Sequence, residues 1–258
     1  MQKITEKFEG YVDIGDIKMF YGSYGTGEPV FLLHGGIVSH TSWFFQIPPL
    51  SKHYQIIAPD TRAHGKSTDS DKPLSYELFA SDVIKLMEKL DIKKASFIGA
   101  SDGGCISLAL GLKYPDVVNK LVLIGTSYNI SNYHEGTLDN FKNYNPNEEL
   151  PKEFALLKQM YEKEAPDPAY WSTLIKKLVQ DLFTREPNFT LDQLKTINNP
   201  TLIIIGENDQ FIPVACNQEM VDVMPNARLE VIQDATHLVP FEKPKQINKI
   251  ILDFLGKE

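Results

Sequence analysis

Residues 99–104 read Gly-Ala-Ser-Asp-Gly-Gly and place Ser101 between glycines. The apolar run 95–98 precedes them, and a helical pattern over 105–112 follows. A Gly-x-Ser-x-Gly between a strand and a helix is typical of a sharp turn that exposes a serine hydroxyl, because glycines let the two elements approach closely. The pattern predicts a nucleophilic Ser101, provided that other residues supply a base, an orienting acid and an oxyanion hole.

A base and an acid follow two later apolar runs. His237 lies in a loop just beyond the apolar run 229–232. Asp209 ends the tetrapeptide Gly-Glu-Asn-Asp, which directly follows the apolar run 202–205. The carboxyl ends of parallel strands share one rim of a sheet, so both side chains are expected to reach Ser101. A serine hydroxyl needs a base to take its proton and a third group to fix that base. We predict that His237 is the base and Asp209 the orienting acid, with Glu207 as the nearer rival to Asp209.

Short apolar runs alternate with helical patterns along most of the chain. An antiparallel hairpin is expected over 11–21, and further runs occur at 30–33, 55–58, 95–98, 121–124, 202–205 and 229–232. Most of these runs lack polar alternation, as is typical of strands buried on both faces of a parallel sheet. Apolar residues recur at helical spacing over 78–90 and after Pro244. The alternation predicts an α/β protein with a doubly wound, mostly parallel sheet and helices on both faces.

The interval from Ser127 to about Thr196 interrupts this alternation. It contains no strand-like run, and residues 171–182 and 154–161 have helical spacing between scattered prolines. We predict a helical cap over 127–196, inserted into a core domain made of 1–126 and 197–258. The alternative is that these residues form further helices covering the sheet.

The chain resembles the α/β-hydrolase fold family over nearly its whole length. The motifs that carry the resemblance are His34-Gly35-Gly36, the segment 60–67 (Asp-Thr-Arg-Ala-His-Gly-Lys-Ser), the Ser101 turn, Gly206-Glu207-Asn208-Asp209 with Pro213, and His237 with Glu242 and Pro244. The order serine, acid, histidine is that of the family. The resemblance implies a mostly parallel eight-stranded sheet and a cap between the sixth and seventh strands.

The resemblance also implies an oxyanion hole made by the backbone N–H groups of Gly36 and Asp102. This is physically reasonable for Asp102, because the first N–H groups of a helix lack partners and carry partial positive charge. His34 and His64 are expected to hold loops around this hole. His40 is expected at the surface or lining the pocket.

Asp60, Arg62 and Asp102 are further charged residues within these motifs. Asp60 and Arg62 are interpreted as a structural pair. Asp102 is an unusual choice after the nucleophile, and Ser-Asp-Gly-Gly resembles the turn of valacyclovir-hydrolase-like enzymes, which implies that its carboxylate receives a substrate α-amino group. The alternative is that Asp102 only complements the helix N-terminus.

Amino-acid composition and net charge limit the classes of function that this chain can have. The chain has 258 residues, 42% hydrophobic and 23% charged, which is ordinary for a globular protein. A net charge of −8 argues against nucleic-acid partners. Two cysteines, a charged N-terminus and short apolar runs favour a cytoplasmic protein without a membrane span. No motif predicts a cofactor or a metal, and the oligomeric state is not readable from the sequence.

These residues predict a serine hydrolase that cleaves small carboxylic esters through an acyl-enzyme. The same residues also serve carbon–carbon bond hydrolases, lactonases, thioesterases and aminoacyl-ester hydrolases or aminopeptidases, because pocket residues set the substrate. A ligand receptor of the same fold with little turnover is the alternative from a different class.

Overall fold

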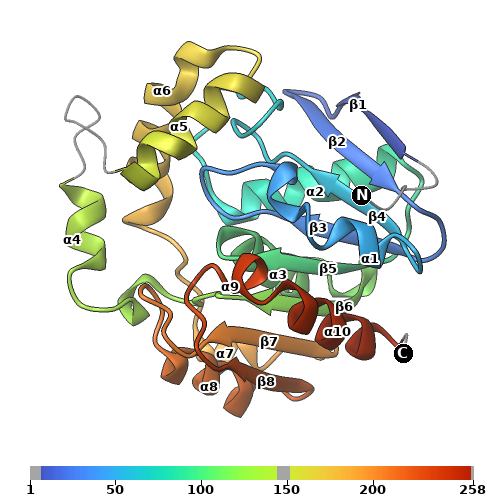
Figure 1. Cartoon of the computed structure of the whole chain (residues 1–258), viewed down its shortest axis with the longest axis vertical. Coiled ribbons are helices and arrows are strands. Elements are labelled where there is room, and N and C mark those ends of the chain that lie inside the picture. The colour runs from blue at the N-terminus through green and yellow to red at the C-terminus, as the bar shows by residue number, and fades with distance from the viewer. Residues whose placement is uncertain (1–6, 144–151, 257–258) are drawn as a thin grey trace.

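The computed structural model of the chain describes residues 7–143 and 152–256 (Figure 1). An eight-stranded sheet lies at its centre, in the order β1-β2-β4-β3-β5-β6-β7-β8. The strands are β1 (Lys7–Asp13), β2 (Lys18–Tyr24), β3 (Pro29–Leu33), β4 (Gln55–Pro59), β5 (Ala95–Ala100), β6 (Val118–Ile124), β7 (Thr201–Gly206) and β8 (Ala227–Ile232).

The sheet is antiparallel at one edge and parallel elsewhere. β1 pairs antiparallel with β2, and β2 pairs antiparallel with β4. All remaining pairs, from β4 across to β8, are parallel. The predicted hairpin and the six predicted apolar strands are therefore confirmed.

Helices cover both faces of the sheet, as predicted. The helices outside residues 127–196 are α1 (Ile47–Leu50), α2 (Tyr76–Lys89), α3 (Asp102–Lys113), α8 (Val214–Val223), α9 (Val239–Glu242) and α10 (Pro244–Leu255). At the end of that interval, α7 (Leu191–Leu194) packs against α3 and α8 of the sheet layers. In Figure 1, α1, α9 and α10 lie in front of the sheet, whereas α2, α3 and α7 lie behind it.

Successive strand residues face opposite layers of core. On β3, Phe31 and Leu33 join the cluster packed under α2 and α3, while Val30 and Leu32 join the cluster packed under α10. All four are at most 1% exposed. This double burial explains why the strands have continuous apolar sequences.

Residues 127–196 form no strand among those described, apart from one isolated bridge between Asn129 and Asn188. Their longer helices are α4 (Thr137–Lys142), α5 (Lys152–Glu164), α6 (Trp171–Lys177) and the π-helix η5 (Leu178–Phe183). In Figure 1, α4, α5 and α6 lie at the left and top, at the end of the sheet where β6 leads into this segment. The helices predicted at 154–161 and 171–182 are thus present, the second one continuing as a π-helix.

Several polar contacts attach this segment to the rest of the chain, among them those made by the carboxylates of Glu164 and Asp69. The Glu164 carboxylate accepts hydrogen bonds from the hydroxyls of Ser39 (2.7 Å) and Thr41 (3.2 Å). The Asp69 carboxylate binds Lys177 and accepts a hydrogen bond from Tyr170 at 2.6 Å. Both contacts join α5–α6 to loops that follow parallel strands, so these helices are held beside the carboxyl rim of the sheet.

Candidate active site

Ser101 stands at the turn between β5 and α3. Its φ of 52° and ψ of −116° are a strained conformation for a residue with a side chain. Its N–H donates to the carbonyl of Ile124 at 2.8 Å, which fixes the turn against the end of β6. A Cβ on Gly99 would collide with the carbonyl of Gly103, and a Cβ on Gly103 would collide with the carbonyl of Leu33. The two glycines therefore let the start of α3 lie close to β5 and to the end of β3.

Asp209 and His237 form a buried pair at the ends of β7 and β8. The Asp209 Oδ2 atom lies 2.7 Å from Nδ1 of His237, and the aspartate side chain is inaccessible to solvent. Its other oxygen, Oδ1, accepts the N–H groups of Phe211 (2.9 Å) and Ile212 (3.0 Å). The Phe211 ring also packs edge-on against the imidazole, with 5.0 Å between centroids. The carboxylate and the aromatic ring together restrict the orientation of His237.

Gly125 joins this pair to the serine turn. It directly follows Ile124, the residue whose carbonyl accepts the Ser101 N–H. A Cβ at Gly125 would lie 3.1 Å from the His237 ring and 3.4 Å from Asp209 Oδ2. The serine, the histidine and the aspartate therefore gather around the carboxyl end of β6.

The loop after β3 lies against the same turn. A Cβ on Gly35 would lie 3.3 Å from Cβ of Ser101, and one on Gly36 would lie 2.5 Å from Oδ2 of Asp102. Asp102 is the first residue of α3, and its N-cap Ser101 makes no side-chain capping bond. The backbone at Gly36 therefore lies close to Ser101 and to the N-terminus of α3. Backbone N–H groups in such positions can stabilise a developing oxyanion.

The Asp102 side chain is buried and lies against Gly36. Its Oδ1 accepts a hydrogen bond from the Tyr76 hydroxyl at 2.9 Å, and no described residue hydrogen-bonds its buried Oδ2. Burial raises the pKa of Asp102 to about 6, while the Tyr76 hydroxyl and the nearby His237 act in the opposite direction. The carboxylate at neutral pH therefore retains an unused acceptor next to Gly36.

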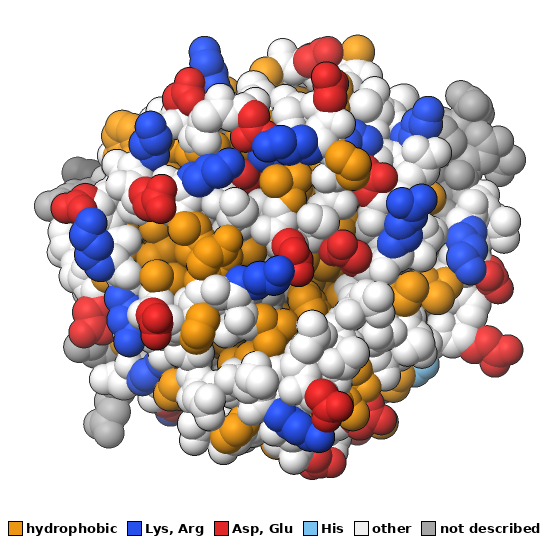
Figure 2. Space-filling view, turned by 180° about the vertical axis from the view of Figure 1, so that it is seen from behind, with side chains coloured by type: hydrophobic (Ala, Val, Ile, Leu, Met, Phe, Trp, Pro, Cys, Tyr) orange, Lys and Arg blue, Asp and Glu red, His pale blue; other side chains and the backbone are white. Residues whose placement is uncertain are grey.

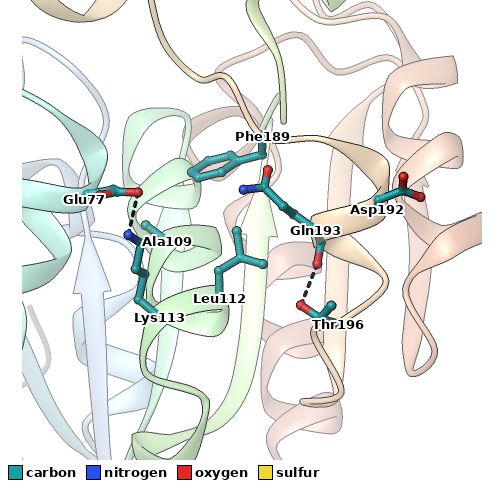
Figure 3. Close-up of a pocket in the computed structure, with 8 residues that line it drawn as sticks. All are labelled: Glu77, Ala109, Leu112, Lys113, Phe189, Asp192, Gln193 and Thr196. Atoms are coloured by element: carbon teal, nitrogen blue, oxygen red, sulfur yellow. Dashed lines mark hydrogen bonds and ion pairs between the residues drawn. The ribbon is translucent and has the colours of Figure 1, made fainter.

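A pocket lies along α2 and α3, apart from the predicted site residues. It has a volume of about 400 Å³ and lies between α2, α3 and α7, with a Glu77–Lys113 ion pair of 2.9 Å at its edge (Figure 3). Figure 2 shows the face behind that of Figure 1, with apolar side chains exposed between lysines and acidic residues. None of the predicted site residues lines this pocket.

Comparisons with known proteins identify the family to which this fold belongs. The sequence pattern of the alpha/beta hydrolase fold family matches residues 28–244. The chain belongs to this family.

Individual relatives are hydrolases of several kinds. The chain is 29% identical to an uncharacterised hydrolase, YugF, of Bacillus subtilis, over 94% of this chain and 96% of that protein. It is 26% identical to the 2-hydroxymuconate semialdehyde hydrolase of a Pseudomonas species, over 90% and 88% of the two chains. Among solved structures, a serine hydrolase involved in carbazole degradation superposes with a TM-score of 0.81 at 25% identity, over 97% and 99% of the two chains.

In this α/β-hydrolase, the other histidines near the site are bound to the scaffold. His34 Nε2 accepts the N–H of Thr61 at 3.0 Å, and its Nδ1 donates to the Gly35 carbonyl at 2.7 Å. Burial lowers the pKa of His34, and it lowers that of His64 to about 4. Both imidazole rings are therefore uncharged at neutral pH and are hydrogen-bonded to residues of the loops after β3 and β4. This agrees with the structural role expected of His34 and His64.

Two sequence-based expectations for this region are wrong. His40 is buried and lies 2.7 Å from Asp60, whereas a surface or pocket-lining position was expected. Arg62 does not pair with Asp60 but binds Asp82 and Asp16. The reason is that Asp60 turns inward toward the helix η1 (His40–Trp43), while Arg62 points to α2 and the β1–β2 turn.

Tyr76, Phe183 and Gly125 are site residues that sequence reasoning missed. Tyr76 is a tyrosine at the start of an amphipathic helix, where it is indistinguishable from an ordinary core residue. Phe183 also lies against Gly36, since a Cβ on Gly36 would lie 3.1 Å from the Phe183 ring. Of these three residues, only Gly125 could have been suspected from the sequence. A glycine directly after a buried strand often marks a place where another part of the chain comes close to the backbone.

Proposed function

We propose that the chain is a serine hydrolase in which Ser101, His237 and Asp209 are the catalytic residues. The observation that carries this proposal is the 2.7 Å contact between Asp209 and His237 beside the strained Ser101 turn. Strain of this kind at an exposed nucleophile is typical of catalytic serines. The backbone N–H groups of Gly36 and Asp102 are proposed as the oxyanion hole.

The proposed reaction proceeds in two steps. Ser101 Oγ attacks the substrate carbonyl carbon while His237 Nε2 takes the hydroxyl proton, and the N–H donors bind the oxyanion. The histidine then gives this proton to the leaving alcohol, and an acyl-enzyme remains. His237 then takes a proton from water, which attacks the carbonyl carbon of the acyl-enzyme. As the tetrahedral intermediate collapses, His237 returns this proton to Ser101 Oγ, and the acid is released. Asp209 holds Nδ1–H throughout and stabilises the imidazolium.

The substrate class that we propose is small carboxylic esters, with residues 127–196 acting as a cap over the core of 1–126 and 197–258. The position of α5 and α6 beside the carboxyl rim supports the cap, as does Phe183 against Gly36. Both cysteines are free and buried, which is consistent with the cytoplasmic location that we propose.

A more specific candidate is an ester whose acyl group carries an ammonium. The unpartnered, buried Oδ2 of Asp102 favours it, because a carboxylate in such a position is stabilised by a cationic partner. The likeness to 2-hydroxymuconate semialdehyde hydrolase instead supports carbon–carbon bond cleavage as the alternative.

A substrate panel tests these assignments. The purified protein is assayed with neutral short-chain esters, the matching thioesters and lactones, aminoacyl esters and a 2-hydroxymuconate semialdehyde. We expect ester hydrolysis to have the highest kcat/KM. Faster cleavage of the semialdehyde would contradict the ester assignment, and labelling of Ser101 without turnover of any substrate would favour a receptor.

A further inference from the structure

The helix α5 is hydrogen-bonded to the loop that carries Gly36. Glu164, the last residue of α5, accepts the Ser39 hydroxyl at 2.7 Å through Oε2, and its Oε1 lies 3.2 Å from the Thr41 hydroxyl. The two hydroxyl oxygens are themselves 2.7 Å apart. One carboxylate of the segment 127–196 therefore holds two residues of the loop after β3, and hydrogen bonds to a carboxylate are stronger than those between neutral groups.

This part of the loop is strained. Ile37, which directly follows Gly36, has a φ of 69°. Such a conformation is unusual for a β-branched residue and persists only where the surrounding structure enforces it. Two residues later, the Ser39 hydroxyl accepts the N–H of Thr41 at 3.3 Å and thereby caps the start of η1. Glu164 thus binds the residue that ends the strained stretch.

Apolar side chains of α5 pack on the same stretch. Leu157, Met160 and Tyr161 line a cavity of only about 10 Å³ together with Ile37 and Val38. This volume is at the lower limit for a single water molecule, so the helix and the loop are in nearly complete contact. The two residues that follow Gly36 are therefore held by α5 through packing as well as through hydrogen bonds.

The backbone N–H of Gly36 is one of the two oxyanion donors in the proposed reaction. We propose that Glu164 is a positioning residue, which makes the placement of this N–H depend on the docking of α5 on the loop. The core also holds the loop, because the Asp60 carboxylate accepts the N–H of His40 at 2.7 Å. Loss of the Glu164 carboxylate therefore weakens the oxyanion hole without abolishing it. The inference rests on the proposed serine-hydrolase reaction.

The test compares wild type with Glu164→Ala, Glu164→Gln and the control Glu162→Ala. Glu162 lies on the same helix, but its carboxylate pairs with Lys158 at 3.7 Å rather than with the loop. Hydrolysis of p-nitrophenyl acetate is measured, and each rate is divided by the concentration of active sites, counted with a fluorophosphonate. A variant that is merely less stable then shows no loss per active site.

An oxyanion donor acts in the transition state, so we expect kcat to fall about tenfold or more in Glu164→Ala while KM stays within about twofold. Glu164→Gln can still accept one hydroxyl and should have an intermediate kcat, whereas Glu162→Ala should match wild type. The Ki of a trifluoromethyl ketone, which forms an oxyanion on Ser101, should rise as kcat falls. An unchanged kcat in Glu164→Ala, or an equal loss in Glu162→Ala, overturns the inference.

Hydrogen exchange separates this inference from the proposed function. Exchange of the backbone N–H groups of residues 35–41 is followed by mass spectrometry without substrate. We expect it to be about tenfold faster in Glu164→Ala than in wild type, and unchanged in Glu162→Ala. Equal exchange contradicts the role of Glu164 even if esters are hydrolysed. Faster exchange, together with absence of ester hydrolysis by wild type, contradicts only the proposed function.

Discussion

At the scale of single residues, the Asp209 carboxylate has two separate tasks. Oδ1 accepts two backbone N–H groups of its own loop, and Oδ2 faces Nδ1 of His237. The first task shapes the loop after β7, and the second selects the imidazole tautomer whose free Nε2 can take a proton. Only the second contact bears on the proposed chemistry.

Asp209→Asn separates these tasks. The amide oxygen can keep the two backbone bonds, while the NH₂ group faces Nδ1 and forces the tautomer with a protonated Nε2. We expect kcat on a neutral ester to fall by about 10³–10⁴-fold with little change in stability, as for the loss of this tautomer in serine hydrolases. Steady-state kinetics and a thermal melt check both outcomes.

Glu207→Gln is the matched control. Glu207 lies two residues away, is exposed, and accepts the Asp234 N–H at 3.2 Å. We expect an unchanged kcat. A large loss in this variant, together with activity in Asp209→Asn, would show that the acid has been assigned to the wrong residue.

At the scale of elements, Arg62 joins three parts of the chain. Its fully buried guanidinium lies 2.7 Å from Asp82 of α2 and 3.2 Å from Asp16 of the β1–β2 turn. It follows β4, so the arginine connects the antiparallel edge, the sheet and a covering helix. A buried carboxylate such as Asp82 depends on this partner because it is withdrawn from water.

Arg62→Met is therefore expected to lower the free energy of unfolding by about 3–5 kcal/mol, because it leaves the Asp82 charge buried without its main partner. Urea unfolding measures the loss. Lys195→Met, which removes an exposed i,i+3 pair with Asp192, is the control and should change stability by less than about 0.5 kcal/mol. A similar small effect in both variants would mean that Arg62 does not carry this connection.

At the scale of the whole molecule, the sequence predicted what depends on neighbours along the chain. Continuous apolar runs imply strands buried on both faces, and residues after such runs meet at one rim, so Ser101, Asp209 and His237 were found together. The partners of Tyr76 and Arg62 were not predictable in this way. They depend on how helices and loops distant in the sequence pack against one another, and Tyr76 and Asp102 are 26 positions apart.

Buried titratable groups also make the stability of the whole molecule depend on pH in two opposing ways. Burial lowers the pKa of His64 to about 4, so the unfolded chain binds more protons and stability is lost as pH falls from about 6.5 to 4. Burial raises the pKa of Asp102 to about 6, so the folded chain binds more protons and this group adds stability as pH falls from about 6 to 4.

Asp102→Asn removes the second contribution and leaves the first. We expect its free energy of unfolding to fall more steeply than that of wild type between pH 7 and 4, by about 3 kcal/mol over the interval. Urea unfolding at several pH values gives the difference. Parallel curves for the two proteins would exclude a raised pKa for Asp102.

The most direct test of the proposed chemistry is covalent labelling of the nucleophile. The protein is treated with a fluorophosphonate, digested and examined by mass spectrometry, while hydrolysis of p-nitrophenyl acetate is followed in parallel. We predict one adduct, on Ser101, that forms as activity is lost, and neither labelling nor turnover in Ser101→Ala. Full activity in Ser101→Ala, or an inactivating adduct on another residue, would contradict the proposed nucleophile.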